Sequence, residues 1–212
     1  MIKTSTDLSI VVMAAGKGTR MNSDTPKVLH SLAGKTLLNH VIDTAGNLSP
    51  QYIVIIVGYK SALVIESINK DNICFSLQNE QKGTGHAVMQ AKEHLGNFKG
   101  QTLVLSGDVP LIKQKTLLSL YEKQINNGFD ACMLTADMED PTGYGRVIRD
   151  ERGYLQKVKE HKDCNSKELQ IKEINSGIYI FNNQLLYNLL PKLDNNNSQS
   201  EYYLPDILSM II

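Results

Sequence analysis

The stretch VVMAAGKGTRMNSDTPK (residues 11–27) joins an apolar run to a loop that contains two glycines, two cations and then a proline–lysine pair. Gly16 and Gly18 allow backbone amides to approach an anion closely, and Arg20 and Lys27 supply positive charge. Open α/β sheets bind ligands at the carboxyl ends of their strands, where this loop begins. The stretch therefore predicts an α/β fold with a phosphate-binding loop. Taken alone, it also fits an exposed glycine turn with two incidental cations.

Two common phosphate loops are excluded by counting residues. A Walker A loop needs a glycine five residues before Gly-Lys-Thr, and the GKT at residues 34–36 has Leu29 there. A dinucleotide fingerprint needs a third glycine, where this chain has Met21. Gly34 and Lys35 are therefore interpreted as a plain turn before a helix at residues 36–48.

Short apolar runs alternate with segments of helical period in the first 130 residues. Apolar residues recur at helical spacing within residues 36–48, 87–95 and 117–125. This alternation predicts a doubly wound, mostly parallel (Rossmann-like) sheet with helices on both faces. The runs predicted as strands buried on both faces are SIVVM (9–13), YIVIIV (52–57), ICFSL (73–77) and TLVLS (102–106).

The pattern changes after about residue 130, where strands follow one another with little helix between them. This change predicts a small antiparallel extension of the same sheet, within a single domain over residues 1–212. DNNNSQS (194–200) is interpreted as a polar loop. The runs that carry the extension are DACMLTADM, GRVIRD, GYLQKVKEH and EINSGIYIFN.

The composition excludes several classes of function. Lys and Arg total 22, as do Asp and Glu, so the formal charge is zero, and nucleic acid is not an expected partner. The three cysteines are scattered without CxxC spacing, which indicates a reducing compartment and no zinc site. The apolar run Ile10–Ala15 is too short for a signal peptide or a membrane span. A cytoplasmic protein without membrane association is expected.

Seven ordered motifs carry a resemblance to a known family. AAGKGTRMNSDTPK matches the signature loop of sugar-1-phosphate nucleotidylyltransferases. With six further motifs, the chain resembles the uridylyltransferase domain of bifunctional N-acetylglucosamine-1-phosphate uridylyltransferase/glucosamine-1-phosphate acetyltransferases. The other motifs are LQNEQKGTGHA (77–87), SGDVPLI (106–112), DPTGYGRVIR (140–149), EHKD (160–163), EINSGIYIFN (173–182) and SEYYLPDIL (200–208).

The resemblance implies a nucleotide-diphospho-sugar transferase fold and a reaction. The enzyme would convert UTP and N-acetylglucosamine 1-phosphate into UDP-N-acetylglucosamine and pyrophosphate, for peptidoglycan and lipopolysaccharide precursors. It implies that Asp108 binds Mg²⁺, that Arg20 holds the outgoing pyrophosphate and that Lys27 stabilises charge on the α-phosphate. From the residues alone, Asp108 could equally initiate a turn before Pro110.

The resemblance also implies a set of substrate-binding residues. Gln78 would pair with the edge of uracil, and Gly145, Glu160 and Asn175 would line the sugar pocket. The residues alone leave open that Thr84 is a helix cap and that Tyr203 is a core anchor. The full set is Met13, Ala14, Ala15, Gly16, Gln78, Gly83, Thr84, Ser106 (an aromatic in some relatives), Gly107, Gly145, Glu160, Asn175 and Tyr203.

Two alternatives remain at this point. One is a non-catalytic nucleotide-sugar-binding module, and the other is a nucleotidylyltransferase for another sugar phosphate. The non-catalytic module is considered because the asparagine that completes the family's metal site would fall beyond Ile212. The family's trimer-forming β-helix domain would also fall beyond Ile212. A monomer is therefore expected for residues 1–212. His86, on a predicted helix face, and His161, in a charged run, are given no role.

Overall fold

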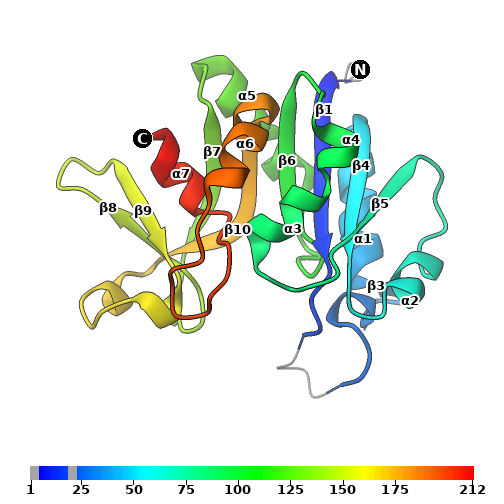
Figure 1. Ribbon diagram of the computed structural model, residues 1–212, viewed down its shortest axis with the longest axis horizontal. Coiled ribbons are helices and arrows are strands. Elements are labelled where there is room, and N and C mark those ends of the chain that lie inside the picture. Colours follow the sequence, from blue (N-terminus) through cyan, green and yellow to red (C-terminus); the bar gives the residue numbers. More distant parts are fainter. Residues whose placement is uncertain (1–4, 19–22) are drawn as a thin grey trace.

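A computed structural model of the chain describes residues 5–18 and 23–212. Eight strands form one sheet in the order β5-β4-β1-β6-β10-β8-β9, with β7 paired to β10 (Figure 1). The strands are β1 (Ser5–Ala14), β4 (Pro50–Val57), β5 (Ile73–Leu77), β6 (Gln101–Ser106), β7 (Ala131–Asp137), β8 (Arg146–Arg149), β9 (Leu155–Lys159) and β10 (Glu173–Asn182).

The first half of the sheet is parallel, as predicted. β1 lies between β4 and β6 and pairs in parallel with both, and β4 pairs in parallel with β5. Residues of β1 alternate between two buried clusters, with Val11 in one and Ile10 in the other, so both faces of this strand are covered. In β5, an edge strand, the predicted burial on both faces is only partial: Cys74 packs against one cluster and Ile73 and Phe75 pack against the other, and Ser76 alone is fully buried.

The second half is antiparallel, which confirms the predicted extension. β10 pairs antiparallel with β6, β7 and β8, and β8 pairs antiparallel with β9. Between β7 and β10 the only helical turns in the described chain are short 3₁₀ segments, His161–Asp163 and Glu168–Gln170. DNNNSQS (194–200) lies in a loop outside any helix or strand, as expected.

Helices cover both faces of the sheet (Figure 1). Residues of α1, α2 and α5 belong to one buried cluster, and residues of α3, α4, α6 and α7 belong to the other. The helix expected over residues 87–95 is interrupted at Ala91, and α6 and α7 were not expected. The helices are α1 (Leu37–Gly46), α2 (Ser61–Glu66), α3 (Thr84–Gln90), α4 (Lys92–Leu95), α5 (Gln114–Asn127), α6 (Asn183–Leu189) and α7 (Asp206–Ile211).

The turn predicted at Gly34 is confirmed. It closes a two-residue hairpin between β2 (Ser31–Leu32) and β3 (Lys35–Thr36), and both turn residues have positive φ, 50° at Ala33 and 80° at Gly34. Thr36 then caps α1, since its side chain accepts a hydrogen bond from the backbone N of Asn39. Within residues 5–18 and 23–212, none of the helices has the length and apolar character needed to cross a bilayer.

Candidate active site

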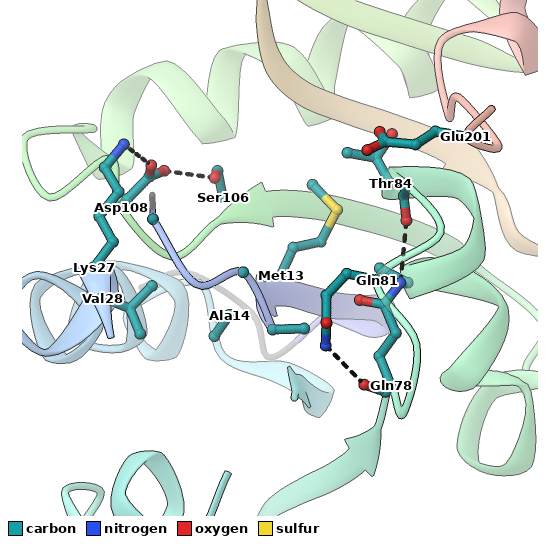
Figure 2. A pocket seen from close by; sticks show the side chains of 15 residues that line it. Met13, Ala14, Lys27, Val28, Gln78, Gln81, Thr84, Ser106, Asp108 and Glu201 are labelled. Atoms are coloured by element: carbon teal, nitrogen blue, oxygen red, sulfur yellow. Dashed lines mark hydrogen bonds and ion pairs between the residues drawn. The ribbon is translucent and has the colours of Figure 1, made fainter. Parts of the chain in front are cut away.

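A pocket of about 320 Å³ opens at the carboxyl ends of β1, β5 and β6 (Figure 2). It brings together ten of the residues named from the sequence, namely Met13, Ala14, Ala15, Gly16, Lys27, Gln78, Gly83, Thr84, Ser106 and Asp108. Gly107 lies beside this group, because its backbone N donates to the Met13 O over 2.9 Å. The parallel half of the sheet therefore brings residues almost a hundred positions apart into one site.

The two loop glycines have different surroundings. A Cβ on Gly18 would lie 2.5 Å from the Cβ of Lys27, and Gly18 has a φ of 70°, so both space and backbone conformation favour glycine there. A Cβ on Gly16 would have no neighbour within 4 Å, which leaves this side of the loop open to a ligand. Arg20 lies outside the described residues, so its role stays a prediction.

Lys27, Ser106 and Asp108 form a polar group on one side of the pocket (Figure 2). Lys27 lies in a 3₁₀ turn (Lys27–Leu29), and its Nζ is 2.5 Å from Oδ2 of Asp108. Ser106, at the end of β6, donates its hydroxyl to Oδ1 of Asp108 over 2.6 Å. Burial raises the pKa of Asp108, but the hydrogen bonds from Lys27 and Ser106 outweigh it and hold this pKa below its usual value. Asp108 is therefore an ionised carboxylate.

The donors near Asp108 fit one kind of metal. In the described part of the chain, no three His, Cys, Asp or Glu side chains gather closely enough to form a protein cage for a cation. Magnesium commonly binds through one carboxylate, with phosphate oxygens and water completing its coordination. A single ionised Asp108 at the edge of the pocket fits that mode, whereas a structural zinc site, which takes four protein ligands, does not fit.

Gln78 lies on the opposite side of the pocket. It follows β5, and its backbone N donates to the Val57 O over 2.8 Å. Its side chain is only 3% exposed, and Nε2 donates to the Gly83 O over 3.2 Å. Gly83 has a φ of 98°, and a Cβ there would lie 2.7 Å from the Tyr202 O, so this residue also requires glycine.

Thr84 is the first residue of α3, whose N-cap is Gly83, so the structure does not support the alternative that Thr84 is the cap. Its hydroxyl instead accepts a hydrogen bond from the backbone N of Leu204 over 3.0 Å. This contact joins the start of α3 to the segment of residues 201–204.

Two lining residues with polar side chains were not named from the sequence. Gln81 donates through Nε2 to the backbone O of Gln78 over 3.3 Å, and Glu201 reaches the pocket from the last segment of the chain. Both fall inside motifs that carried the family resemblance, LQNEQKGTGHA and SEYYLPDIL. Membership of these motifs is the signal that could have identified the two residues, because a lone glutamine or glutamate does not by itself indicate a role.

The four residues predicted for the sugar pocket are not among those that line this pocket: Gly145, Glu160 and Asn175 lie in the antiparallel half, and Tyr203 lies in the segment before α7. Glu160 and Tyr203 line a second hollow of about 390 Å³. A Cβ on Gly145 would lie 3.1 Å from Oε1 of Glu160, and the backbone N of Asn175 donates to the Gly145 O over 2.9 Å. The four predicted residues therefore neighbour one another. Burial and the nearby carboxylates of Asp163, Asp206 and Glu201 raise the pKa of Glu160.

Asn175 and Tyr203 also have structural contacts. Oδ1 of Asn175 accepts from the Gly177 N over 3.0 Å and the Tyr179 hydroxyl over 2.8 Å, which leaves its Nδ2 as the group able to donate to a ligand. Tyr203 is 7% exposed, and its hydroxyl donates to Asp163 over 3.3 Å. Its ring therefore also serves as the buried anchor that the sequence had left as an alternative.

The segment of residues 201–204 lies between the two hollows. Glu201 lines the first hollow, and Tyr203 lines the second. The backbone of Tyr202 is held from both sides, since its O accepts from the Gly85 N and its N donates to the Lys82 O, each over 2.8 Å.

Residues 9–212 match the nucleotidyl transferase family. The chain belongs to this family. This nucleotidyl transferase chain is 46% identical over 200 residues to "Bifunctional protein GlmU" of Streptococcus thermophilus, covering 94% of this chain and 43% of that protein. It is 47% identical over 201 residues to the protein of the same name from Clostridium tetani, covering 95% of this chain and 44% of that protein. The chain thus spans less than half the length of these relatives.

Solved structures of low sequence identity show that this nucleotidyl transferase has a nucleotide-diphospho-sugar transferase fold, as expected. UDP-glucose pyrophosphorylase, solved in complex with UDP-glucose, superposes with a TM-score of 0.75 at 19% identity, over 96% of this chain and 86% of that one. HddC from Yersinia pseudotuberculosis superposes with a TM-score of 0.64 at 22% identity, over 93% of this chain and 83% of that one.

Proposed function

We propose that this protein transfers a uridylyl group from UTP to N-acetylglucosamine 1-phosphate, giving UDP-N-acetylglucosamine and pyrophosphate. The observation that carries the proposal is one pocket that combines a glycine loop, the Lys27–Asp108 pair and the buried Gln78 amide. The identity of 46% to a protein named GlmU over nearly the whole chain supports it. We further propose that residues 1–212 act as one domain and that the protein works in the cytoplasm.

The reaction needs a positioned nucleophile rather than a general base. The second phosphate pKa is about 6, so the sugar phosphate already carries an ionised oxygen at neutral pH. That oxygen attacks the α-phosphorus of UTP, the α–β phosphoanhydride bond breaks, and pyrophosphate leaves with its electron pair. Alignment of the two substrates and neutralisation of phosphate charge then supply the rate enhancement.

The chain's own residues have distinct roles in this scheme. Lys27 leaves Asp108 to contact the α-phosphate, where it stabilises the charge that develops, and Arg20 holds the outgoing pyrophosphate. Asp108 would hold Mg²⁺, which when bound supplies further charge neutralisation on the phosphates. The amides around Gly16 bind phosphate oxygens, and Gln78 binds the base.

The second hollow would take the sugar. A carboxylate, a carboxamide and a backbone amide can satisfy hydroxyl and N-acetyl groups; Glu160 lines this hollow, and Gly145 and Asn175 adjoin Glu160 without lining it. The segment of residues 201–204 borders both hollows, which supports a nucleotide and a sugar bound next to one another.

Pyrophosphate release tests this function. The protein with Mg²⁺ is mixed with each pairing of UTP, CTP, ATP, GTP or dTTP with N-acetylglucosamine 1-phosphate, glucosamine 1-phosphate or glucose 1-phosphate. The highest kcat/KM is expected for UTP with N-acetylglucosamine 1-phosphate. Binding of UTP without release of pyrophosphate in any pairing would support the non-catalytic module instead, and a different preferred sugar phosphate would support the other alternative.

A further inference from the structure

The amide of Gln78 has a defined orientation because its nitrogen has two acceptors. Nε2 donates to the Gly83 O over 3.2 Å and lies 3.0 Å from Nδ1 of His86. A backbone carbonyl can only accept, so the amide nitrogen rather than the oxygen must face Gly83. The amide oxygen therefore points toward the interior of the pocket, as Figure 2 shows.

His86 completes this arrangement in only one of its forms. A neutral imidazole has one acceptor nitrogen, and Nδ1 must be that nitrogen to receive the second N–H of Gln78. Nε2 of His86 then carries the ring proton. If Nδ1 carried it instead, two donors would face one another, and the amide oxygen would be drawn away from the pocket.

Gln90 also approaches the ring of His86, at its other nitrogen. Its Nε2 lies 3.3 Å from Nε2 of His86, but it donates over 2.9 Å to the backbone O of His86. Gln78 and Gln90 each also donate to a backbone carbonyl, so the shorter of the two ring contacts, from Gln78 to Nδ1, assigns the acceptor to Nδ1.

The imidazole ring is held in place by its neighbours. His86 lies in the first turn of α3, and the centroid of its ring is 6.3 Å from that of Tyr202 at an interplanar angle of 32°. Tyr202 is itself anchored by backbone hydrogen bonds to Lys82 and Gly85. The position of Nδ1 is thus set by packing, which makes His86 suited to hold another side chain.

We propose that His86 is a positioning residue for base selection. Its Nδ1 holds Gln78 with the amide oxygen toward the base, so that the pocket favours a base whose ring N3 carries a proton, as in uracil. Cytosine, whose N3 is an acceptor, would face an acceptor and leave the pair unmade. This inference rests on the proposed function, in which Gln78 binds the base.

Three variants test the proposal through the ratio of kcat/KM for UTP to that for CTP. His86→Leu removes the acceptor at similar size and should lower the ratio about tenfold or more. His86→Asp places a carboxylate oxygen, which only accepts, near the position of Nδ1 and should keep the ratio within about threefold of wild type. Gln90→Ala, the matched control on the same helix face, should leave the ratio unchanged. Thermal melts establish that each variant is folded.

The outcomes separate this inference from the proposed function. An unchanged ratio in His86→Leu, or an equal loss of the ratio in His86→Leu and His86→Asp, overturns the positioning role. The proposed function is still upheld in that case if the wild type prefers UTP. A wild type without that preference contradicts both. Nitrogen-15 NMR of the His86 ring gives a readout independent of activity: an unprotonated Nδ1 is expected, and a protonated Nδ1 overturns the proposal.

Discussion

At the residue scale, the main feature of the phosphate end of the pocket is that its cation and its carboxylate are paired. Lys27 must exchange Asp108 for a phosphate oxygen to act on a substrate, and Asp108 must exchange Lys27 for a cation. Each exchange alone would leave a charge without its partner, so an anion and a metal that arrive together replace the pair at lower cost.

Lys27→Ala should lower kcat by about 10²–10³-fold, because one preorganised charge stabiliser is lost. The melting temperature should change little, since the Lys27 side chain is 42% exposed. Lys35→Ala, which removes a cation that pairs with Asp43 outside the pocket, is the control and should keep wild-type turnover. A fall in kcat of less than tenfold for Lys27→Ala would show that the assigned role is wrong.

Asp206 should make stability depend on pH. Burial, with Asp194 and Asp163 nearby, raises the pKa of its carboxyl to about 6. The folded state then binds this proton more tightly than the unfolded chain, whose pKa is about 4, so this contribution to stability is full below pH 4 and is lost as pH rises toward 6.

Asp206→Asn should therefore be more stable than wild type at pH 8, by about 1 kcal/mol after allowance for solvent screening, and equal to it near pH 4. Denaturant unfolding at several pH values measures the difference. Glu66→Gln makes the same change of charge at an exposed position and should show no such trend. A difference that stays constant from pH 4 to pH 8 would mean that the Asp206 carboxyl does not titrate as described.

Residue roles were predictable from the sequence where a motif carried them. The glycine loop, Lys27, Gln78 and Asp108 were all named, and the structure brings their described members into one pocket. His86 was given no role, because a lone histidine on a helix indicates nothing until the amide opposite it is known. The functional roles themselves stay predictions until the assays above are made.

At the element scale, hydrogen bonds join the start of α3 to the segment of residues 201–204. Thr84→Val should destabilise the protein by about 1–2 kcal/mol, since the buried backbone N of Leu204 loses its acceptor. Thr84→Ser keeps the hydroxyl and should recover most of this loss. Urea unfolding of the three proteins provides the measurement, and equal stability of the Val and Ser variants would show that the hydrogen bond contributes nothing.

Helices and strands were predicted well where the hydrophobic periodicity is strong, and less well where tertiary packing determines their bounds. All four strands of the parallel half were located within a few residues, and β5 was predicted to its bounds. The break between α3 and α4 falls at Ala91, which has a ψ of −1°. No glycine or proline stands at this position, so the sequence does not mark the break. The six and seven residues of α7 and α6 are too few for a clear helical period.

At the scale of the whole molecule, a buried polar network joins the two halves. The Ser9 and Thr102 hydroxyls lie 2.8 Å apart, and Thr102 donates to Oδ1 of Asn183 over 2.6 Å. Nδ2 of Asn183 donates to the carbonyls of Leu95 and Phe98, each over 2.8 Å. This network ties β1 and β6 to α6 and to the end of α4.

Asn183→Leu should destabilise the protein by about 3 kcal/mol, because three buried polar groups lose their partner at once. For a chain of this size the melting temperature should fall by roughly 6–12 °C. Gln184→Leu, at the exposed neighbouring position, should shift it by less than about 2 °C. A similar small shift in Asn183→Leu would show that the network adds no net stability.

The sheet's class was predictable from alternation, but its strand order was not. Strand period identifies β6 and β10 separately, yet their pairing joins residues more than seventy positions apart, such as Val104 and Tyr179. The pairing of β6 with β10 depends on how helices can cover both faces of the assembled sheet, and a single strand does not carry that information. The assembly of the sheet also places Gly145, Glu160 and Asn175 beside one another, and their spacing in the sequence does not predict this.

Because Glu201 and Tyr203 border different hollows within one short segment, a ligand that moves this segment from one hollow would also reshape the other. If a nucleotide draws residues 201–204 closer to α3, the sugar hollow changes shape with it, and linkage requires that the sugar alter nucleotide affinity by the same factor. The order in which the two substrates bind, and the tightness with which the joined product is retained, would then be set by the stiffness of four residues.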